Sequence, residues 1–367
     1  MTSLSSRTLD LAVKIQQISA PTFHEAPRAS YVRDLFEREH FKDVSIDAPG
    51  NVYARLPGKN SSLAPLIISA HLDTVFPRTV DLKLRDEMGK IIAPGIGDNS
   101  LGVASLFGIH WGLQDGKTSL EHDIWLVANV AEEGLGDLRG MRTVVERFGV
   151  NVIGYLVLEG LALGHIYHKA IGVKRYRVRA LTAGGHSWSD YGQPSAVHEL
   201  ASLVTRLTSI PLPREPRTTL NVGTISGGTG INVLASESTC ELDLRSEDPS
   251  LLSRIADQVE DLLHDANCAD VKVEFEIVGQ RPAGEIPEDH PFVQLAMNCT
   301  RETGVEPVPT AGSTDANIPL SRGIPAVVMG ITTGGGAHTT HEYINTEPVV
   351  KGMRALLRFV EKAGGGK

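Results

Sequence analysis

Helical and strand-like patterns of apolar residues alternate along most of this 367-residue chain. Apolar side chains recur at helical spacing in five segments, which are residues 7–18, 26–39, 101–113, 139–148 and 348–362. Short, mostly apolar runs predict strands, and these are residues 44–56 (broken at Pro49-Gly50-Asn51), 65–70, 123–131, 152–158 and 324–330. Alternation of this kind predicts an α/β domain with a mixed, largely parallel sheet.

The pattern changes near Gly172. Residues 173–181 alternate apolar and charged side chains, which predicts a strand with one face in water. The elements predicted next are a helix (195–207), two strands (220–226 and 238–245), a helix (250–266) and a strand (271–278). This β-α-β-β-α-β order is typical of a ferredoxin-like unit, followed by a Gly- and Pro-rich exit linker at 279–288. We therefore expect residues 173–282 to be a domain inserted between two parts of a larger one, 1–172 and 283–367.

Composition narrows the classes of function. Asp and Glu outnumber Lys and Arg by 44 to 35, giving a net charge of −9, and this disfavours nucleic acid or a membrane surface as partner. The three cysteines, Cys240, Cys268 and Cys299, have no metal-ligand spacing and suggest no disulfide framework. The N-terminus predicts an amphipathic helix rather than a signal peptide, and no apolar run approaches the ~20 residues of a membrane span. We expect a cytoplasmic protein.

Histidine and carboxylate residues follow several of the predicted buried strands, where open α/β sheets place their ligand sites. They are His71 and Asp73, Asp98 in a glycine-rich turn, the pair Glu132-Glu133, Glu159, and His338. Any one of them alone is more commonly structural or solvated. However, a buried unpaired carboxylate costs several kcal/mol, so an adjacent Glu pair directly after a buried strand calls for a cation. Histidine and carboxylate ligands without cysteine suit Zn²⁺, with Co²⁺ or Mn²⁺ as alternatives.

Five sequence blocks carry a family resemblance: HLDTVFP (71–77), GIGDNSLG (95–102), EEGLGDLRG (132–140), LEG (158–160) and GSTDAN with AHTTHEYI (312–317, 337–344). In this order they resemble the signature of the co-catalytic zinc peptidases, which include peptidase T, glutamate carboxypeptidase, aminoacylase-1 and acetylornithine deacetylase. The resemblance covers nearly the whole chain. It implies a catalytic domain interrupted by a ferredoxin-like lid and dimerisation domain, and two divalent metal ions per chain.

The resemblance also implies individual roles. His71 and Glu159 resemble the ligands of one metal, Glu133 and His338 those of the other, and Asp98 the carboxylate that bridges both. Asp73 resembles the group that orients His71, and Glu132 the general base. His341, three residues after His338, could compete for the ligand role, although the spacing before Glu342-Tyr343 favours His338. Asn99 stands where many relatives have an acidic residue.

Four further residues resemble substrate-binding positions of the family. In the inserted domain, His186 resembles a histidine that stabilises the oxyanion, often from the partner subunit, and Asn232 a residue that contacts substrate. Arg245 resembles an arginine that binds a substrate carboxylate, with a salt bridge to Asp243 or Glu247 as the alternative. Asp315 resembles part of a substrate-side loop, and a plain turn is an equal alternative there.

These expectations combine into a two-metal hydrolase that cleaves an amide bond in a small peptide by attack of a metal-bridging water, through a gem-diolate intermediate. Glu132 would take the proton from that water and pass it to the leaving amine. One alternative is a deacylase of N-acyl amino acids, and another is a catalytically silent metal-binding relative. The sequence leaves open the substrate, the amino- or carboxypeptidase direction and the native metal, and it predicts a homodimer through the inserted domain.

Overall fold

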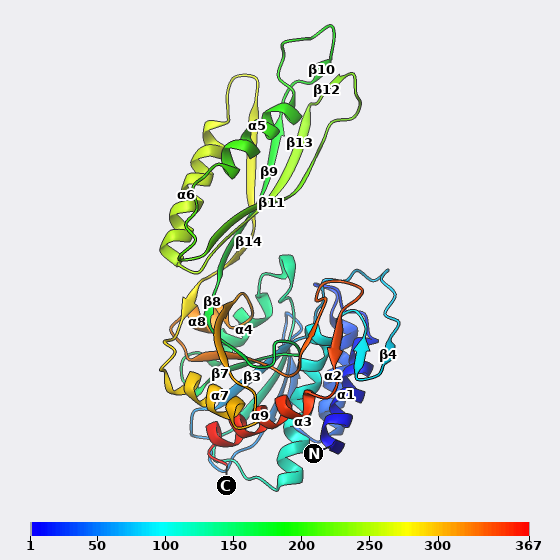
Figure 1. Cartoon of the computed structure of the whole chain (residues 1–367), viewed down its shortest axis with the longest axis vertical. Helices are drawn as coiled ribbons and strands as arrows, with labels where there is room; N and C mark the ends of the chain where they lie inside the picture. The colour runs from blue at the N-terminus through cyan, green and yellow to red at the C-terminus, as the bar shows by residue number, and fades with distance from the viewer. Residues whose placement is uncertain (1, 367) are drawn as a thin grey trace. The chain divides into compact units, whose positions relative to one another are not determined.

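The computed structural model describes residues 2–366, and the chain divides into two compact units (Figure 1). The smaller unit is the continuous segment Ile171–Ala283, and the larger unit consists of the residues before and after it. The smaller unit is therefore an insertion in the larger one. Within residues 2–366, no helix is both long enough and apolar enough to cross a membrane.

A nine-stranded mixed sheet forms the centre of the larger unit, in the order β1-β2-β6-β3-β7-β17-β8-β15, with β16 beside β8. Its strands are β1 (Lys42–Ile46), β2 (Val52–Leu56), β3 (Leu66–His71), β6 (Ile124–Asn129), β7 (Gly154–Glu159), β8 (His165–Ala170), β15 (Gly284–Glu285), β16 (Val308–Gly312) and β17 (Ala326–Gly330). The four central strands β6, β3, β7 and β17 run parallel. Antiparallel pairs are added on both sides. The largely parallel sheet predicted from the sequence is thus confirmed.

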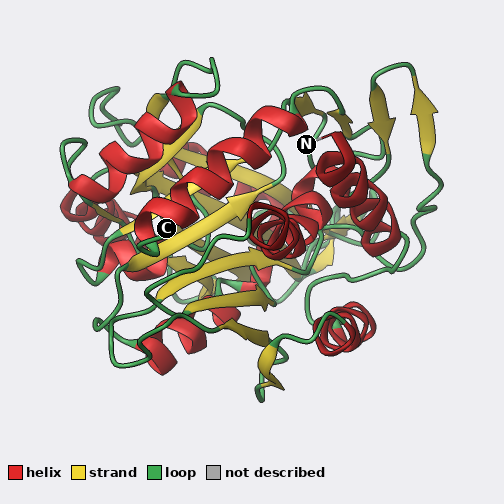
Figure 2. Cartoon of the chain, turned by 90° about the horizontal axis from the view of Figure 1, so that it is seen from below, coloured by secondary structure: helices red, strands yellow, loops and turns green. Residues whose placement is uncertain are grey.

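Helices cover both faces of this sheet, as Figure 2 shows. They are α1 (Thr2–Gln16), α2 (Ala26–Arg38), α3 (Leu101–Gly116), α4 (Arg139–Phe148), α7 (Pro291–Arg301), α8 (Asn317–Ser321) and α9 (Val349–Ala363). Strand β3 is buried at every position because side chains on both of its faces pack into the core. Helix α3 is apolar around most of its circumference and contacts α1, α9 and β3.

A small sheet, ordered β18-β19-β5-β4, lies apart from the central one. Its strands are β4 (Arg85–Glu87), β5 (Lys90–Ile92), β18 (Gly334–Gly335) and β19 (Tyr343–Asn345). The pairing of β5 with β19 joins segments that are about 250 residues apart in the chain. It therefore holds the chain just before Asp98 against the chain just after His338.

The inserted unit is an antiparallel sheet ordered β11-β13-β9-β14, with two helices. Its elements are β9 (Gly172–Leu181), α5 (Ala196–Thr208), β11 (Thr218–Gly227), β13 (Glu237–Ser246), α6 (Pro249–Asp265) and β14 (Lys272–Arg281), with a short pair β10 (Gly185–His186) and β12 (Val233–Leu234). Along β9, Tyr176 and Val178 are buried, while Arg177 and Arg179 pair with carboxylates. The ferredoxin-like unit predicted from alternation is confirmed.

Several elements differ from the sequence-based expectation. The apolar pattern predicts neither strand β8 nor helix α7, and β8 is rich in polar residues and buries only alternate positions. Strand β14 extends to Arg281, which pairs with Val173. The segment expected to be a linker from residue 279 therefore begins as strand, and a second short strand, β15, lies inside it.

Candidate metal centre

The carboxyl ends of three adjacent parallel strands bring the first candidate residues together. His71 is the last residue of β3 and lies opposite Asn129 at the end of β6. Glu159 is the last residue of β7, on the other side of β3. Glu132 and Glu133 follow β6 within four residues. Parallel pairing thus concentrates these side chains at one edge of the sheet, as in other open α/β sheets.

Asp98 lies between the two candidate histidines. Its Oδ1 is 3.1 Å from Nε2 of His71, and its Oδ2 is 3.0 Å from Nε2 of His338. Beyond them, Oε2 of Glu159 lies 3.7 Å from His71 Nε2, and Oε1 of Glu133 lies 3.2 Å from His338 Nε2. Each oxygen of Asp98 therefore faces one histidine–glutamate pair. The structure brings together all five residues expected to be ligands.

The charges of this cluster favour divalent cations. His71, Asp98 and Glu133 each offer a ligand atom, and these atoms lie within 4.8 Å of one another. Burial, with repulsion from Asp98 and Glu132, raises the pKa of Glu133 and Glu159 to about 7. Burial disfavours the charged form of a carboxylate, and neighbouring negative charges disfavour it further. The donor set, carboxylate oxygens and imidazole nitrogens, fits Zn²⁺ or a similar ion.

The histidines carry the compensating charge. Burial by itself lowers the pKa of His71, but the surrounding carboxylates of Asp73, Asp98 and Glu159 raise it well above its usual value. Hydrogen bonds to Asp98 and Glu133 raise the pKa of His338 to about 10. The surrounding carboxylates therefore favour the protonated form of both rings when no cation is bound. A divalent cation would replace those protons.

Asp73 connects β3 to the glutamate pair. Its side chain is fully buried, with Oδ1 accepting from the Glu132 N–H at 3.0 Å and Oδ2 from the Glu133 N–H at 2.9 Å. The Thr22 hydroxyl also donates to Oδ2. The sequence predicts a contact with the His71 ring, but Nδ1 of His71 lies nearer the backbone oxygen of Asp73 (3.1 Å) than its carboxylate (3.6 Å). Asp73 thus fixes the backbone that carries both glutamates.

A turn, Ile96–Ser100, presents Asp98 to the histidines. Asn99 in this turn is buried, donating from Nδ2 to the Leu158 carbonyl and accepting at Oδ1 from the Gly160 N–H. It therefore ties the turn to the end of β7, next to Glu159. This bond explains why a neutral residue suits the position, because an acidic side chain has no proton to donate to a carbonyl.

His338, rather than His341, faces the carboxylates. His338 has a left-handed backbone, with φ of 66°, and its side chain is 55% exposed. His341 instead lines a separate pocket of about 370 Å³, with Val80, Asp81, Lys83, Arg85, Pro94 and Thr340. A positive φ is uncommon for a residue with a Cβ, so its occurrence at His338 marks a position where the surrounding loop dictates the conformation.

Asp315 lies differently from what its motif suggests. The side chain has no exposed surface, and its Oδ2 accepts from Nδ2 of Asn129 at 2.7 Å. Within residues 2–366, Oδ1 of Asp315 and Oδ1 of Asn129 have no hydrogen-bond partner. Burial and the nearby charge of Glu132 raise the pKa of Asp315 well above its usual value. A fully buried side chain needs a rearrangement to contact substrate, and the substrate-side role suggested by the motif stays a prediction.

The other three candidate residues lie in the inserted unit. His186 is exposed on β10, and its Nδ1 accepts from the backbone N–H of Trp188 at 3.2 Å. Asn232 is exposed, and its backbone oxygen accepts from the Ser187 N–H. Arg245 makes the ion pair left open by the sequence, with Nε 2.7 Å from Oδ1 of Asp243.

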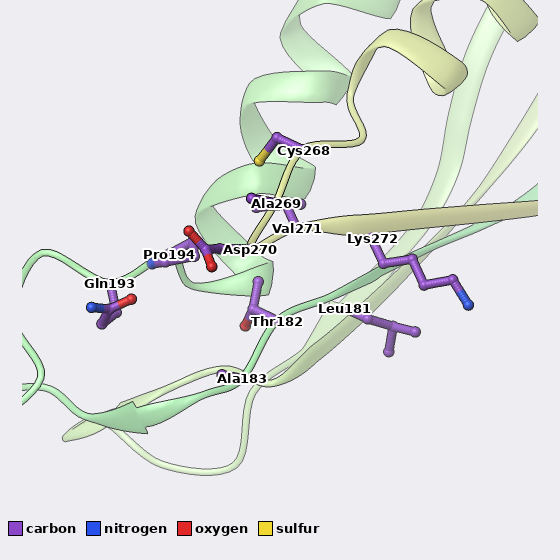
Figure 3. A pocket seen from close by; sticks show the side chains of 10 residues that line it. All are labelled: Leu181, Thr182, Ala183, Gln193, Pro194, Cys268, Ala269, Asp270, Val271 and Lys272. Carbon is purple, nitrogen blue, oxygen red and sulfur yellow. The ribbon is translucent and has the colours of Figure 1, made fainter.

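A second hollow lies within the inserted unit (Figure 3). It has a volume of about 340 Å³ and lies where the end of β9, the start of α5 and the turn before β14 meet. Its side chains are those of Leu181, Thr182, Ala183, Gln193, Pro194, Cys268, Ala269, Asp270, Val271 and Lys272. It contains none of the candidate site residues.

Sequence reasoning missed Asn129 and Glu342. Glu342 is fully buried, and its carboxylate accepts hydrogen bonds from the turn that carries Asp98. Burial and repulsion from Asp98 raise the pKa of Glu342 to about 7. The sequence signal for Glu342 is its place in the last motif, four residues after His338. In the sequence that spacing distinguishes His338 from His341 and does not indicate a role for Glu342 itself.

Comparisons with known proteins show which family the chain resembles. The model of the family described as peptidase family M20/M25/M40 matches residues 67–362. A Bacillus subtilis relative, "Uncharacterized protein YqjE", is 23% identical, over 97% of this chain and 98% of its own length.

Solved structures resemble the whole fold. A tripeptidase from Staphylococcus aureus has a TM-score of 0.83 at 20% identity, covering 98% of this chain and 99% of that one. Bacillus subtilis YXEP, titled a dinuclear metal binding peptidase from the M20 family, has a TM-score of 0.71 at 16% identity, covering 100% of this chain and 99% of that one. At such identities the likeness shows a shared fold.

Proposed function

Because the chain belongs to peptidase family M20/M25/M40, we propose that it is a two-metal hydrolase that cleaves an amide bond in small peptides. The single observation that carries this proposal is the position of Asp98, with one carboxylate oxygen toward each histidine–glutamate pair. A carboxylate in that position suits two cations bridged by one group. The dinuclear site named for YXEP is in keeping with it.

We assign each ion two side chains besides Asp98. His71 and Glu159 would hold one ion, and Glu133 and His338 the other. Zn²⁺ is the ion we propose, with Co²⁺ or Mn²⁺ as alternatives. Bound there, the two ions would polarise the scissile carbonyl and lower the pKa of a water molecule.

Glu132 is the residue we assign as general base. Its neighbour Glu133 turns toward His338, and repulsion from Glu132 contributes to the raised pKa of both Glu133 and Glu159, in keeping with a Glu132 carboxylate beside the proposed ligands. The bond from its N–H to Asp73 holds its backbone in place. From this position its carboxylate would accept a proton from the attacking water and return it to the nitrogen of the leaving amine.

The inserted unit would contribute to substrate binding. We propose that His186 stabilises the oxyanion, that Asn232 contacts the substrate and that Arg245 binds a substrate carboxylate. Asp315 would support the site from behind, through Asn129, rather than contact substrate directly.

We also propose a homodimer formed through the inserted unit. Several apolar side chains are exposed close in sequence to His186 and Asn232, namely Trp188 (87%), Tyr191 (89%), Ile231 (104%) and Val233 (43%). Strand β11 is an edge strand, and Ile225 on it is 57% exposed. Exposed apolar side chains beside an open strand edge are typical of a protein–protein interface.

Small peptides are the substrate class we favour, in keeping with the tripeptidase that shares the fold. A deacylase of N-acyl amino acids is the second candidate, because the same ions and base would serve any amide. A screen of dipeptides, tripeptides and N-acyl amino acids with added Zn²⁺, Co²⁺ or Mn²⁺ separates the two. Hydrolysis of N-acyl amino acids alone would favour the deacylase.

The experiment that tests the proposal is Glu132→Gln, with exposed Glu87→Gln as a matched control. We expect Glu132→Gln to keep two metal ions per chain by elemental analysis and to lose activity by about 100- to 10,000-fold, because only proton transfer is removed. Near-normal turnover in this variant would show that another group is the base. Less than one ion per chain in the reconstituted wild type would exclude the two-metal site itself.

A further inference from the structure

Glu342 makes an unusual set of contacts for a fully buried acidic residue. Its Oε1 accepts from the backbone N–H groups of Gly97 and Asp98, at 2.7 and 2.8 Å, and its Oε2 accepts from the Gly95 N–H at 2.9 Å. Gly97 and Asp98 belong to the turn Ile96–Ser100, and Gly95 directly precedes it. One carboxylate therefore binds three backbone N–H groups at the start of that turn.

The backbone around Glu342 is held independently of its carboxylate. The Ala93 N–H donates to the Glu342 carbonyl at 2.9 Å, and beyond it β5 pairs with β19. These bonds end at Ala93, before the turn. The Glu342 side chain reaches further, to the backbone N–H groups of Gly97 and Asp98, so the carboxylate extends the connection to the candidate ligand.

The same short segment carries His338. Within it, the Thr339 N–H donates to the Gly336 carbonyl, and the Glu342 N–H donates to the Thr339 carbonyl. These bonds fold residues 336–342 into consecutive tight turns, which set the separation of His338 from Glu342. At one end, His338 Nε2 lies 3.0 Å from Asp98 Oδ2. At the other end, Glu342 binds the Asp98 N–H.

The geometry points to Glu342 as a positioning residue that fixes Asp98 relative to His338 and thereby sets the affinity of the site for its second metal ion. This inference rests on the proposed two-metal function. Asp98 has two oxygens to share, so a small rotation of its backbone improves its contact with one ion at the expense of the other. Outer-shell partners of metal ligands commonly change metal affinity 10- to 100-fold.

Glu342→Gln tests the inference with little change in volume. The single amide oxygen still accepts from Gly97 and Asp98, but the amide NH₂ then faces the Gly95 N–H, and two donors repel each other. We expect metal affinity to fall by about 10- to 100-fold for one of the two ions. Exposed Glu347→Gln, five residues along the chain, is the matched control and should bind both ions as the wild type does.

Metal affinity is measured by competition of the metal-free protein with a chromophoric chelator, and ligand geometry by the visible spectrum of bound Co²⁺. Far-UV circular dichroism confirms that each variant is folded. If Glu342→Gln does not fold, Glu342→Asp, which keeps the charge but shortens the reach by one methylene, is measured in the same way.

The outcomes separate the two proposals. Weaker binding of one ion and an altered Co²⁺ spectrum in a folded variant support the positioning role, which a purely structural residue would not produce. Wild-type affinity and spectrum, even with a lower melting temperature, overturn it while leaving the proposed function intact. Failure of the wild type to bind two ions overturns the proposed function and, with it, this inference.

Discussion

Replacing Asp73 by Asn tests how the site is held together. The carboxylate accepts the N–H of Glu132 at one oxygen, and the N–H of Glu133 and the hydroxyl of Thr22 at the other. An asparagine has the same shape but only one acceptor oxygen. Whichever way the amide is turned, its NH₂ group faces one of the two backbone N–H groups.

The expected loss follows from these contacts. A hydrogen bond to a charged group contributes about 1.5–3 kcal/mol, and a buried N–H left without an acceptor costs about 1–3 kcal/mol, so we expect the free energy of unfolding to fall by about 3–5 kcal/mol. Buried Arg28 adds to the loss. Burial lowers the pKa of Arg28 to about 10, and the negative charge of Asp73 opposes part of that fall. The displaced glutamate pair should also lower kcat.

The assay is urea unfolding of the metal-free protein at pH 7, with exposed Asp86→Asn as the control. Burial alone would raise the pKa of Asp73, but the nearby His71 ring and the hydrogen bonds from the Glu132 and Glu133 N–H groups lower it below its usual value. Its contribution is therefore present at neutral pH and is lost as the pH falls through the lowered pKa, where wild type and variant should converge. An unfolding free energy within about 0.5 kcal/mol of wild type at pH 7 would refute the reasoning.

Two other predictions concern metal uptake and assembly. Because the pKa values of His71 and His338 are raised, adding Zn²⁺ to the metal-free protein at pH 7 should release protons, and affinity should rise with pH. Calorimetry in buffers of different ionisation enthalpy measures this release, and a heat independent of the buffer would contradict it. If the inserted unit forms the dimer, Ile231→Asp should lower the sedimenting mass toward the 39.5 kDa of one chain, whereas Met88→Asp, equally exposed in the larger unit, should not. Equal masses for both variants would place the interface elsewhere.

The fold was predictable where one periodicity dominates. Strand β3 is mostly apolar and is buried at every position, and helix α4 has the bounds that its spacing predicts, Arg139–Phe148. Strand β8 was missed because His165, His168 and Lys169 interrupt its apolar positions, and its identity as a strand depends on pairing with β17. The pattern of apolar residues indicates which positions of a segment are buried. A strand that is stabilised mainly by pairing with adjacent strands therefore shows only a weak apolar pattern in its sequence.

The candidate site was predictable to the extent that its residues follow buried strands. His71 and Glu159 end their strands, and a parallel sheet brings such ends together. The bonds from Glu342 to the turn of Asp98 cross 244 to 247 positions of sequence, and no local rule anticipates them. For Asp315 the motif suggests a position near substrate, but no local pattern indicates that the side chain is fully buried.

The two connections of the inserted unit leave and re-enter the larger unit side by side. Ala170, at the end of β8, is paired with Gly284, at the start of β15, and the unit's first and last strands are themselves partners, with Val173 opposite Arg281. The main sheet can thus be closed across this gap by a short turn. Whole ferredoxin-like domains can therefore be exchanged at this junction, by recombination or by design, without changing the strand order of the domain that carries the candidate metal ligands.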